Sequence, residues 1–306
     1  MKRIFLFILT NILVILTINI VLSILGVNHY LSASGINYQS LMVFCLVYGF
    51  VGSFISLMIS KFMAKTMMGV QIIAPNAPGP YSSLVHRIHH LARHNGLQKM
   101  PEVGVYESPE INAFATGPSK NNSLVAVSTG LLQKMTDDEV EAVLAHEIGH
   151  IANGDMVTMA LVQGVINAFV MFFARVAAFL LQQALRGNSD DREEGSSFSG
   201  GWTYMLTTML FEMVFGFLGM FVVSYFSRHR EFRADASAAK SVGANKMIAA
   251  LQRLKSNYET MSQTQSGGNF QAFKISSKTG GLMAMLSTHP SLDLRIEALK
   301  KNPFGQ

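Results

Sequence analysis

The sequence is poor in charged residues and has almost no cysteine. Charged side chains make up 14% of its 306 residues, against about 25% in ordinary soluble domains, so we expect much of the chain to lie in lipid. Cys45 is the single cysteine, which excludes an intramolecular disulfide. The net charge is +5, but no basic run is interleaved with aromatic residues. This pattern argues against a nucleic-acid partner and favours an anionic lipid surface.

Four long apolar segments are present, at residues 4–26, 41–60, 157–185 and 203–226. Each is long enough to cross a bilayer, which takes about 20 apolar residues. A cleaved signal peptide is the alternative for the first segment, but its apolar run exceeds the roughly 7 to 15 residues of a signal. We therefore predict an integral membrane protein with an N-terminal transmembrane hairpin (residues 1–65) and a second hydrophobic hairpin (residues 157–226).

Basic residues lie just before the first segment, at Lys2 and Arg3, and just after the second segment, at Lys61 and Lys65. The connecting residues 27–40 contain no Lys or Arg, so the positive-inside rule places both ends of the hairpin in the cytoplasm. The polar sequence then forms one cytoplasmic domain in two parts, residues 66–156 and residues 227–306.

The second hairpin carries one charge in each of its segments, Arg175 and Glu212. At 1.5 Å rise per residue, they lie roughly 15 and 14 Å from the outer turn, which is a matching depth. A lone charge there costs at least about 2.5 to 3.5 kcal/mol. We predict that the two side chains pair; the alternative is a hairpin that only dips into the membrane or lies against the soluble domain.

His146, Glu147 and His150 form an HExxH sequence. Histidines four residues apart share one face of a helix and can reach one Zn²⁺, while the Glu can hold a water beside the metal. The alternative for this short pattern is a pair of surface histidines. The helix is predicted to begin near Asp137, after the capping box Thr136 to Glu139, and to end at Asn153-Gly154.

A catalytic zinc site usually has a third protein ligand. The extended pattern HExxHxxGxxH is excluded, because Asn153 and Met156 occupy its Gly and His positions. Glu231, which follows the fourth apolar segment, is the best candidate, since an antiparallel hairpin brings its surroundings back to the histidines. Asp235, one turn later, could accept a hydrogen bond from a ligand histidine; the alternative is a helix face with ordinary ion pairs.

Three short β-rich stretches lie at residues 102–106, 111–115 and 124–128, separated by turn-forming clusters. They predict a small sheet beside the zinc helix, in a protein that is otherwise mainly α. An exposed sheet edge can hold a peptide in extended form, and Asn112, Ala113, Phe114 and Ala115 are the candidate substrate-binding residues. An ordinary covered strand is the alternative.

These motifs, together with Asn112 to Gly117 upstream and Ser287 to Asp293 downstream, resemble the bacterial heat-shock proteases of the M48 metallopeptidase family. The resemblance extends over nearly the whole chain. It implies a gluzincin-like fold, one Zn²⁺ per chain held by His146, His150 and Glu231, and Glu147 as the catalytic residue. It also implies a location in the bacterial inner membrane, with the active site facing the cytoplasm.

The resemblance places His289 near the site, where it is a candidate to stabilise the developing oxyanion. Pro290 suits the first turn of the last helix, so a cap-region role is the alternative. The polar stretch at residues 255–281 is predicted to form a mobile loop, which could be a lid, a self-cleavage site or filler.

We therefore expect a membrane-bound zinc endopeptidase that cleaves misfolded or damaged membrane proteins from the cytoplasmic side during stress. Its expected partners are unfolded polypeptides, membrane-protein substrates and the lipid bilayer; oligomerisation stays open. The alternatives are a zinc-stabilised membrane chaperone or scaffold without turnover, and a relative of the prenyl-protein peptidases.

Overall fold

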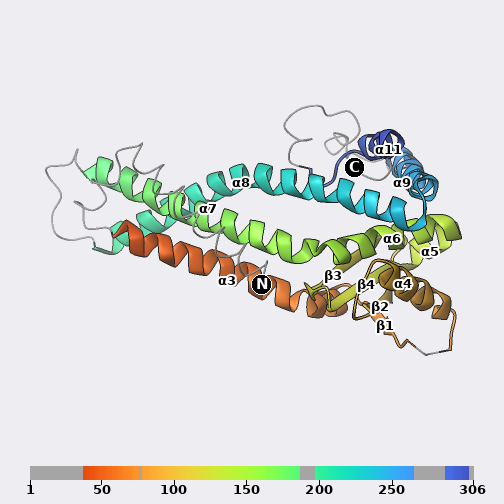
Figure 1. Ribbon diagram of the computed structural model, residues 1–306. Helices are drawn as coiled ribbons and strands as arrows, with labels where there is room; N and C mark the ends of the chain where they lie inside the picture. The colour runs from red at the N-terminus through yellow and green to blue at the C-terminus, as the bar shows by residue number, and fades with distance from the viewer. Residues whose placement is uncertain (1–36, 76–77, 187–196, 265–286, 303–306) are drawn as a thin grey trace. The chain divides into compact units, whose positions relative to one another are not determined.

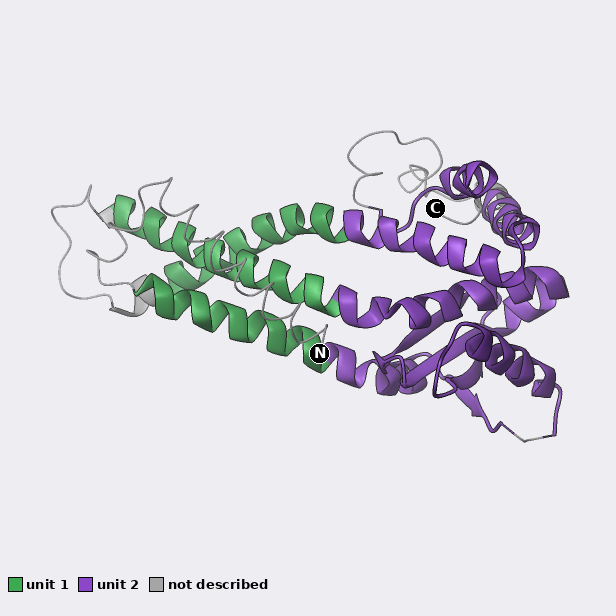
Figure 2. Ribbon diagram, in the orientation of Figure 1, with its two compact units in different colours: residues 1–55, 160–223 green, residues 56–159, 224–306 purple. Residues whose placement is uncertain are grey.

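The computed structural model describes residues 37–75, 78–186, 197–264 and 287–302. These residues are mostly helical, with one four-stranded sheet, which confirms the predicted mainly α composition with a small sheet. The chain divides into two compact units, coloured separately in Figure 2. Unit 1 comprises residues 1–55 and 160–223, and unit 2 comprises residues 56–159 and 224–306.

The helices and strands follow one another in the order labelled in Figure 1: α3 (Tyr38–Met67), β1 (Gln71–Ile73), α4 (Ser82–His94), β2 (Glu102–Tyr106), β3 (Ala113–Ser119), β4 (Asn122–Ser128), α5 (Thr129–Lys134), α6 (Asp137–Asn153), α7 (Asp155–Arg186), α8 (Ser197–Val242), α9 (Ala244–Thr264) and α11 (Leu292–Lys301). Helices α3, α7 and α8 contribute residues to both units.

The sheet of unit 2 has the strand order β1-β2-β4-β3. Strand β2 runs parallel to β4, whereas β1 and β3 pair antiparallel with their neighbours. Strand β3 is therefore an edge strand of the described sheet, and it contacts α6. This places Ala113, Phe114 and Ala115 of the substrate-strand candidates at an edge, next to the helix that carries the HExxH sequence.

One strand prediction is wrong, and one strand was not predicted. The stretch at residues 111–115 is wrong at both ends, because β3 begins at Ala113 and runs to Ser119. Gly117, which belongs to the turn-forming cluster between the second and third predicted stretches, lies in this strand with φ 137°. A Cβ there would be 2.2 Å from the carbonyl oxygen of Asn122. Glycine is needed at this position for that reason. Strand β1 was not predicted, since three residues are too few to show a period.

Helix α6 begins and ends where the sequence predicts. The backbone N–H of Thr136 donates to Glu139 Oε2 at 2.8 Å, and the N–H of Glu139 donates to Thr136 Oγ1 at 3.4 Å. These two bonds complete the capping box. At the other end Gly154 has a left-handed conformation, with φ 74°, and Lys120 donates to the carbonyl of Ala152.

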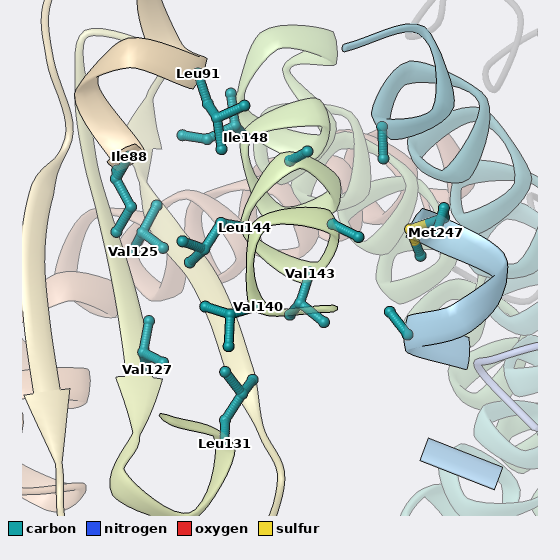
Figure 3. Close-up of a cluster of buried hydrophobic side chains, with 14 of the residues drawn as sticks. Ile88, Leu91, Val125, Val127, Leu131, Val140, Val143, Leu144, Ile148 and Met247 are labelled. Atoms are coloured by element: carbon teal, nitrogen blue, oxygen red, sulfur yellow. The ribbon is translucent and has the colours of Figure 1, made fainter. Parts of the chain in front are cut away.

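The apolar faces of α6 form the centre of unit 2. Val140, Leu144 and Ile148 are buried, and in Figure 3 they lie among side chains of α4, β4 and α9: Ile88, Leu91, Val125, Val127 and Met247. Full burial of one such aliphatic side chain stabilises the fold by about 1.5 to 3 kcal/mol. The helix that carries the histidines is thus fixed by its own core packing.

Helix α9 corrects the predicted loop at residues 255–281. The helix continues to Thr264, because its buried face, with Met247, Ala250 and Leu251, anchors it to the core and the polar residues that follow still favour a helix. Residues 265–286 lie outside the described residues, so the remainder of that prediction stays a prediction.

Among the described residues, three helical stretches are long and apolar enough to cross a membrane: Tyr38–Met67, Asp155–Leu185 and Trp202–Val242. They contain three of the four predicted segments, and the segment at residues 4–26 lies outside the described residues. The fourth segment and the predicted Glu231 helix are one continuous helix, α8.

Within unit 1, α3 and α7 approach closely. A Cβ on Gly49 would lie 2.8 Å from both the carbonyl oxygen of Gly164 and the amide nitrogen of Ala168. A cluster of buried side chains surrounds this contact: Met42, Cys45, Leu46, Phe50, Ala168, Phe172 and Val176. In contrast, α8 exposes large apolar side chains in this unit, including Met205, Met209, Leu210 and Met213.

Arg175 and Glu212 pair in unit 1. Arg175 Nη1 donates to Glu212 Oε1 at 3.0 Å, which confirms the predicted contact. The guanidinium also lies 5.8 Å from the ring centroid of Phe44, within the range of a cation–π contact. The charge in each segment thus has a defined partner.

Candidate metal centre

Three buried side chains of unit 2 converge: His146 and His150 from α6, and Glu231 from α8. The Nε2 atoms of the two histidines are 3.1 Å apart. Glu231 Oε1 lies 3.3 Å from His150 Nε2, and Glu231 Oε2 lies 3.6 Å from His146 Nε2. All three ligand atoms lie within 4.8 Å of one another, close enough to share one ion.

Helices α6 and α8 can come this close because residue 149 has no side chain. A Cβ on Gly149 would lie 3.2 Å from Ser237 Cβ and 3.3 Å from the carbonyl oxygen of Ala234. That spacing is tighter than ordinary van der Waals contact, so a larger residue would push the Glu231 helix away from the histidines.

An aspartate holds the other ring nitrogen of each histidine. His146 Nδ1 lies 2.8 Å from Asp235 Oδ1, and His150 Nδ1 lies 2.7 Å from Asp155 Oδ2. A carboxylate accepts a hydrogen bond but cannot donate one when ionised, so each histidine carries its proton on Nδ1. Each Nε2 is then the ring nitrogen left to bind an ion at the shared centre.

The two aspartates are in turn held by arginines. Arg295 of α11 donates to both carboxylate oxygens of Asp235, at 2.7 and 2.6 Å, and its Nη1 lies 3.5 Å from Glu231 Oε2. Arg233 of α8 donates to Asp155 Oδ1. Both aspartates are almost fully buried, and buried charges of this kind need such partners.

Burial and hydrogen bonding act in opposite directions on the pKa values of the site. Burial lowers the pKa of His146, but hydrogen bonds to Asp235 and Glu231 outweigh it and raise this pKa to about 9. Burial raises the pKa of Asp235, but Arg295 and His146 hold it below its usual value. Contacts with His146, His150 and His289 likewise overcome burial and hold the pKa of Glu231 far below its usual range. Both carboxylates therefore stay ionised.

The donor set fits a zinc ion. Glu231 Oε1 is buried without a hydrogen-bond partner, and it lies 3.3 Å from His150 Nε2. Two imidazole nitrogens and a carboxylate oxygen that converge in this way can serve together as ligands of one cation. Two histidines and one glutamate would hold Zn²⁺ and leave a fourth position open, as in catalytic zinc sites.

Glu147 follows the first candidate ligand and is partly buried. Its carboxylate lies close enough to contribute to the pKa of a neighbouring side chain: burial, then the charges of Glu110 and Glu147, raise the pKa of the Tyr106 phenol.

His289 lies at the centre as well, in the segment before α11. Its Nδ1 is 3.0 Å from Glu231 Oε2, and the side chain is 63% exposed. Arg228 donates to the carbonyl oxygen of Ser287 at 2.9 Å, which holds this segment near α8. His289 therefore contacts a candidate metal ligand and also faces solvent.

The four substrate-strand candidates have different surroundings. The backbone N–H of Asn112 donates to Ser128 Oγ at 3.1 Å, and its carbonyl accepts from the N–H of Ser128 at 2.9 Å. Asn112 is thus tied to β4 and lies just outside β3. Ala113 and Ala115 pack against the main core, whereas the Phe114 ring contacts Tyr106 with ring centroids 5.7 Å apart.

Asp155 and Arg295 are not among the site residues predicted from the sequence. The signal for Asp155 is its place directly after Gly154, where the chain turns out of the histidine helix. Arg295 lies one turn into a short amphipathic helix, and no pattern in the sequence links it to Asp235.

Comparison with known proteins gives one family. The sequence profile of peptidase family M48 matches residues 80–302. Protease HtpX of Aeromonas hydrophila subsp. hydrophila is 51% identical over 300 residues, covering 98% of this chain and 100% of the relative. Protease HtpX homolog of Bacillus subtilis is 50% identical over 307 residues, covering 98% and 99%. The crystal structure of S. mikatae Ste24p has a similar fold, with a TM-score of 0.56 at 22% identity, covering 96% of this chain and 66% of that chain.

Proposed function

This chain belongs to peptidase family M48, and from that premise we propose that it hydrolyses peptide bonds with Zn²⁺ held by His146, His150 and Glu231. It is a membrane-bound metalloprotease of bacterial type, similar to HtpX over almost its whole length. The observation that carries the ligand assignment is the convergence of two Nε2 atoms and one buried carboxylate within 4.8 Å.

When bound, Zn²⁺ supplies a Lewis acid that makes a water acidic and polarises the scissile carbonyl. Glu147 is the general base: it takes a proton from the attacking water and later delivers it to the leaving amine. Asp235 keeps the proton of His146 on Nδ1, so that Nε2 is free to bind. His289, exposed beside Glu231, donates to the developing oxyanion from its outer ring nitrogen.

Edge strand β3 is the proposed binding surface for substrate. A peptide that adds to a sheet edge is held by backbone hydrogen bonds and needs no particular side chains, which suits an enzyme that acts on unfolded chains. Phe114 and the flanking Ala113 and Ala115 contribute the contact, and Asn112 supports the start of the strand through Ser128. The proposed substrates are misfolded or damaged membrane proteins.

The proposed location is the bacterial inner membrane, with the site facing the cytoplasm. Support comes from the basic residues that flank the first two apolar segments and from the apolar helices. Fusing a reporter active only in the cytoplasm after Asn302, and a second reporter active only in the periplasm at the same point, tests this orientation. Signal from the periplasmic reporter alone would reverse it.

The central test compares Glu147→Gln with Glu141→Gln in protein purified in detergent and loaded with zinc. Both residues lie on α6, but Glu141 pairs with Lys246 at 2.6 Å, away from the ligands. Glu147→Gln should lower the rate of casein cleavage by about 10²- to 10⁴-fold and keep its zinc, while Glu141→Gln should retain activity. Full activity in Glu147→Gln would remove Glu147 from the mechanism.

The same experiment distinguishes the alternatives. A zinc-stabilised scaffold or chaperone would bind zinc and leave casein intact in both the wild type and the variants. A prenyl-protein peptidase would cleave prenylated peptides in preference to casein. Neither is favoured, because relatives about 50% identical over almost the whole chain are described as protease HtpX.

A further inference from the structure

His150 and Asp155 form a buried contact that the mechanism above does not use. Asp155 is fully buried, with 0% exposure. One of its oxygens lies 2.7 Å from His150 Nδ1, and the other accepts from Arg233. Both acceptor atoms of this carboxylate therefore have a partner.

We infer that Asp155 is a positioning residue for the second zinc ligand, and that Arg233 fixes Asp155 in turn. The inference rests on the proposed zinc peptidase function. Asp155 touches neither the ion nor the substrate; it acts on His150, by keeping the ring proton on Nδ1 and by fixing the plane of the imidazole. A carboxylate in this position also makes the ligand nitrogen more basic.

The geometry of the chain makes this contact possible. Five residues along an unbroken α-helix rotate a side chain by roughly 140°, which would point Asp155 away from His150. The left-handed turn at Gly154, with φ 74°, ends α6 and starts α7 at Asp155. This break brings the first residue of the next helix back to the histidine.

The two histidines are held in parallel ways with different outer partners. His146 depends on Asp235 and Arg295, and both of these side chains are buried. His150 depends on Asp155, which is buried, and on Arg233, whose side chain is 52% exposed. We therefore expect Asp155 to matter more than Arg233, because water can replace part of the guanidinium but cannot reach the carboxylate.

Zinc affinity, measured by competition with a chromophoric chelator in detergent, tests the inference without using activity. Asp155→Ala should weaken zinc binding about 100-fold, and Asp155→Asn about tenfold, since the amide oxygen still accepts from Nδ1 but carries no charge. Arg233→Gln should weaken it less than Asp155→Asn does. The visible spectrum of the Co²⁺-loaded protein should change in Asp155→Ala, because it reports the ligand geometry directly.

Asp137→Asn is the matched control. Asp137 is also the first residue of a helix and also pairs with an arginine, Arg87, at 3.0 Å, but its side chain is 90% exposed and contacts no histidine. Its zinc affinity should stay within twofold of the wild type. If Asp137→Asn and Asp155→Asn weakened zinc binding equally, the cause would be the loss of any negative charge at a helix terminus. That result would overturn the inference.

Zinc binding by Asp155→Ala within twofold of the wild type, with an unchanged Co²⁺ spectrum, would also overturn it. If circular dichroism shows that Asp155→Ala does not fold, the test uses Asp155→Asn and Arg233→Gln instead. Wild-type zinc affinity in both of these variants would overturn the inference. A wild-type protein that binds no zinc would instead refute the proposed function, so the two failures are distinguishable.

Discussion

The two units differ in where their large apolar side chains lie. Unit 2 buries them around α6, where Leu144 and Ile148 are 0% exposed. Unit 1 leaves many on the surface of its helices; Leu210 and Met213 of α8 are 59% and 69% exposed. The hydrophobic effect in water favours the buried arrangement of unit 2, whereas exposed apolar side chains such as those of unit 1 are compatible with lipid as the solvent. One chain thus contains helices adapted to each solvent.

The units differ in the same way in their charges. Unit 2 buries a network in which Glu231, Asp235 and Asp155 are each contacted by a histidine and an arginine. In unit 1, Arg175 pairs with Glu212, and their side chains are 24% and 37% exposed. The buried carboxylates of unit 2 thus have several partners each, whereas the ion pair of unit 1 joins one guanidinium to one carboxylate.

The largest expected stability effect comes from removing one charge of the buried network. Arg295→Met removes the two hydrogen bonds from Arg295 to Asp235 and its contact at 3.5 Å with Glu231, so it should lower the free energy of unfolding by about 3 to 5 kcal/mol. Arg233→Met, at a half-exposed side chain, should cost clearly less. Urea unfolding in detergent, followed by circular dichroism, measures both; equal effects would contradict the role of burial.

The next prediction compares the apolar residues of the two units. Leu144→Ala creates a cavity in the core of unit 2 and should cost about 2 to 5 kcal/mol. Leu210→Ala removes a side chain that faces outwards, so the change should stay within about 0.5 kcal/mol. The same urea unfolding experiment applies. A large loss in Leu210→Ala would mean that this face of α8 packs against protein rather than lipid.

A third test concerns the ion pair of unit 1. Arg175→Leu and Glu212→Leu should each destabilise the protein by at least about 2.5 kcal/mol, because each leaves a lone charge at membrane depth. The double variant should be more stable than the sum of the two losses predicts, since no charge remains unpaired. Thermal unfolding in lipid nanodiscs gives the cycle; wild-type stability and activity in both single variants would refute a role for the pair.

The smallest expected effect is at the start of α6. Thr136→Ala removes the side-chain acceptor for the N–H of Glu139 and should cost about 1 kcal/mol. Thr136→Ser, which keeps the hydroxyl, is the control and should be close to neutral. A shift of several kcal/mol in the urea midpoint would show that Thr136 has a role beyond capping.

Most of the fold could be predicted from local patterns in the sequence. The capping box at Thr136 and the turn at Asn153-Gly154 predict where α6 begins and ends. Both signals depend only on the side-chain or backbone preferences of the residues at the helix ends. Apolar length predicts the three described membrane helices. Strand β3 was misplaced because Gly117 and Ser119 resemble turn residues, whereas their strand conformation depends on the neighbouring strand β4.

The residues of the candidate site likewise fall into those that local patterns predict and those that depend on the tertiary structure. The roles of His146, Glu147 and His150 could be predicted from their spacing on one helix. Glu231 could be predicted because the hydrophobic hairpin between His150 and Glu231 returns the chain to the histidines. Asp155 could not be read from helical spacing, because its contact with His150 depends on the left-handed turn at Gly154. Arg295 reaches Asp235 only through the packing of α11, a contact between distant parts of the chain that leaves no period in the sequence.

The order of the ligands along the chain has a consequence for biosynthesis. His146 and His150 leave the ribosome before the apolar segments of the second hairpin, and Glu231 follows about 80 residues later. At roughly 5 to 20 residues per second, the nascent chain lacks its third ligand for several seconds. Arg295, close to the C-terminus, arrives last. A partly translated chain therefore has no complete centre with which to cut its neighbours while both are still being inserted.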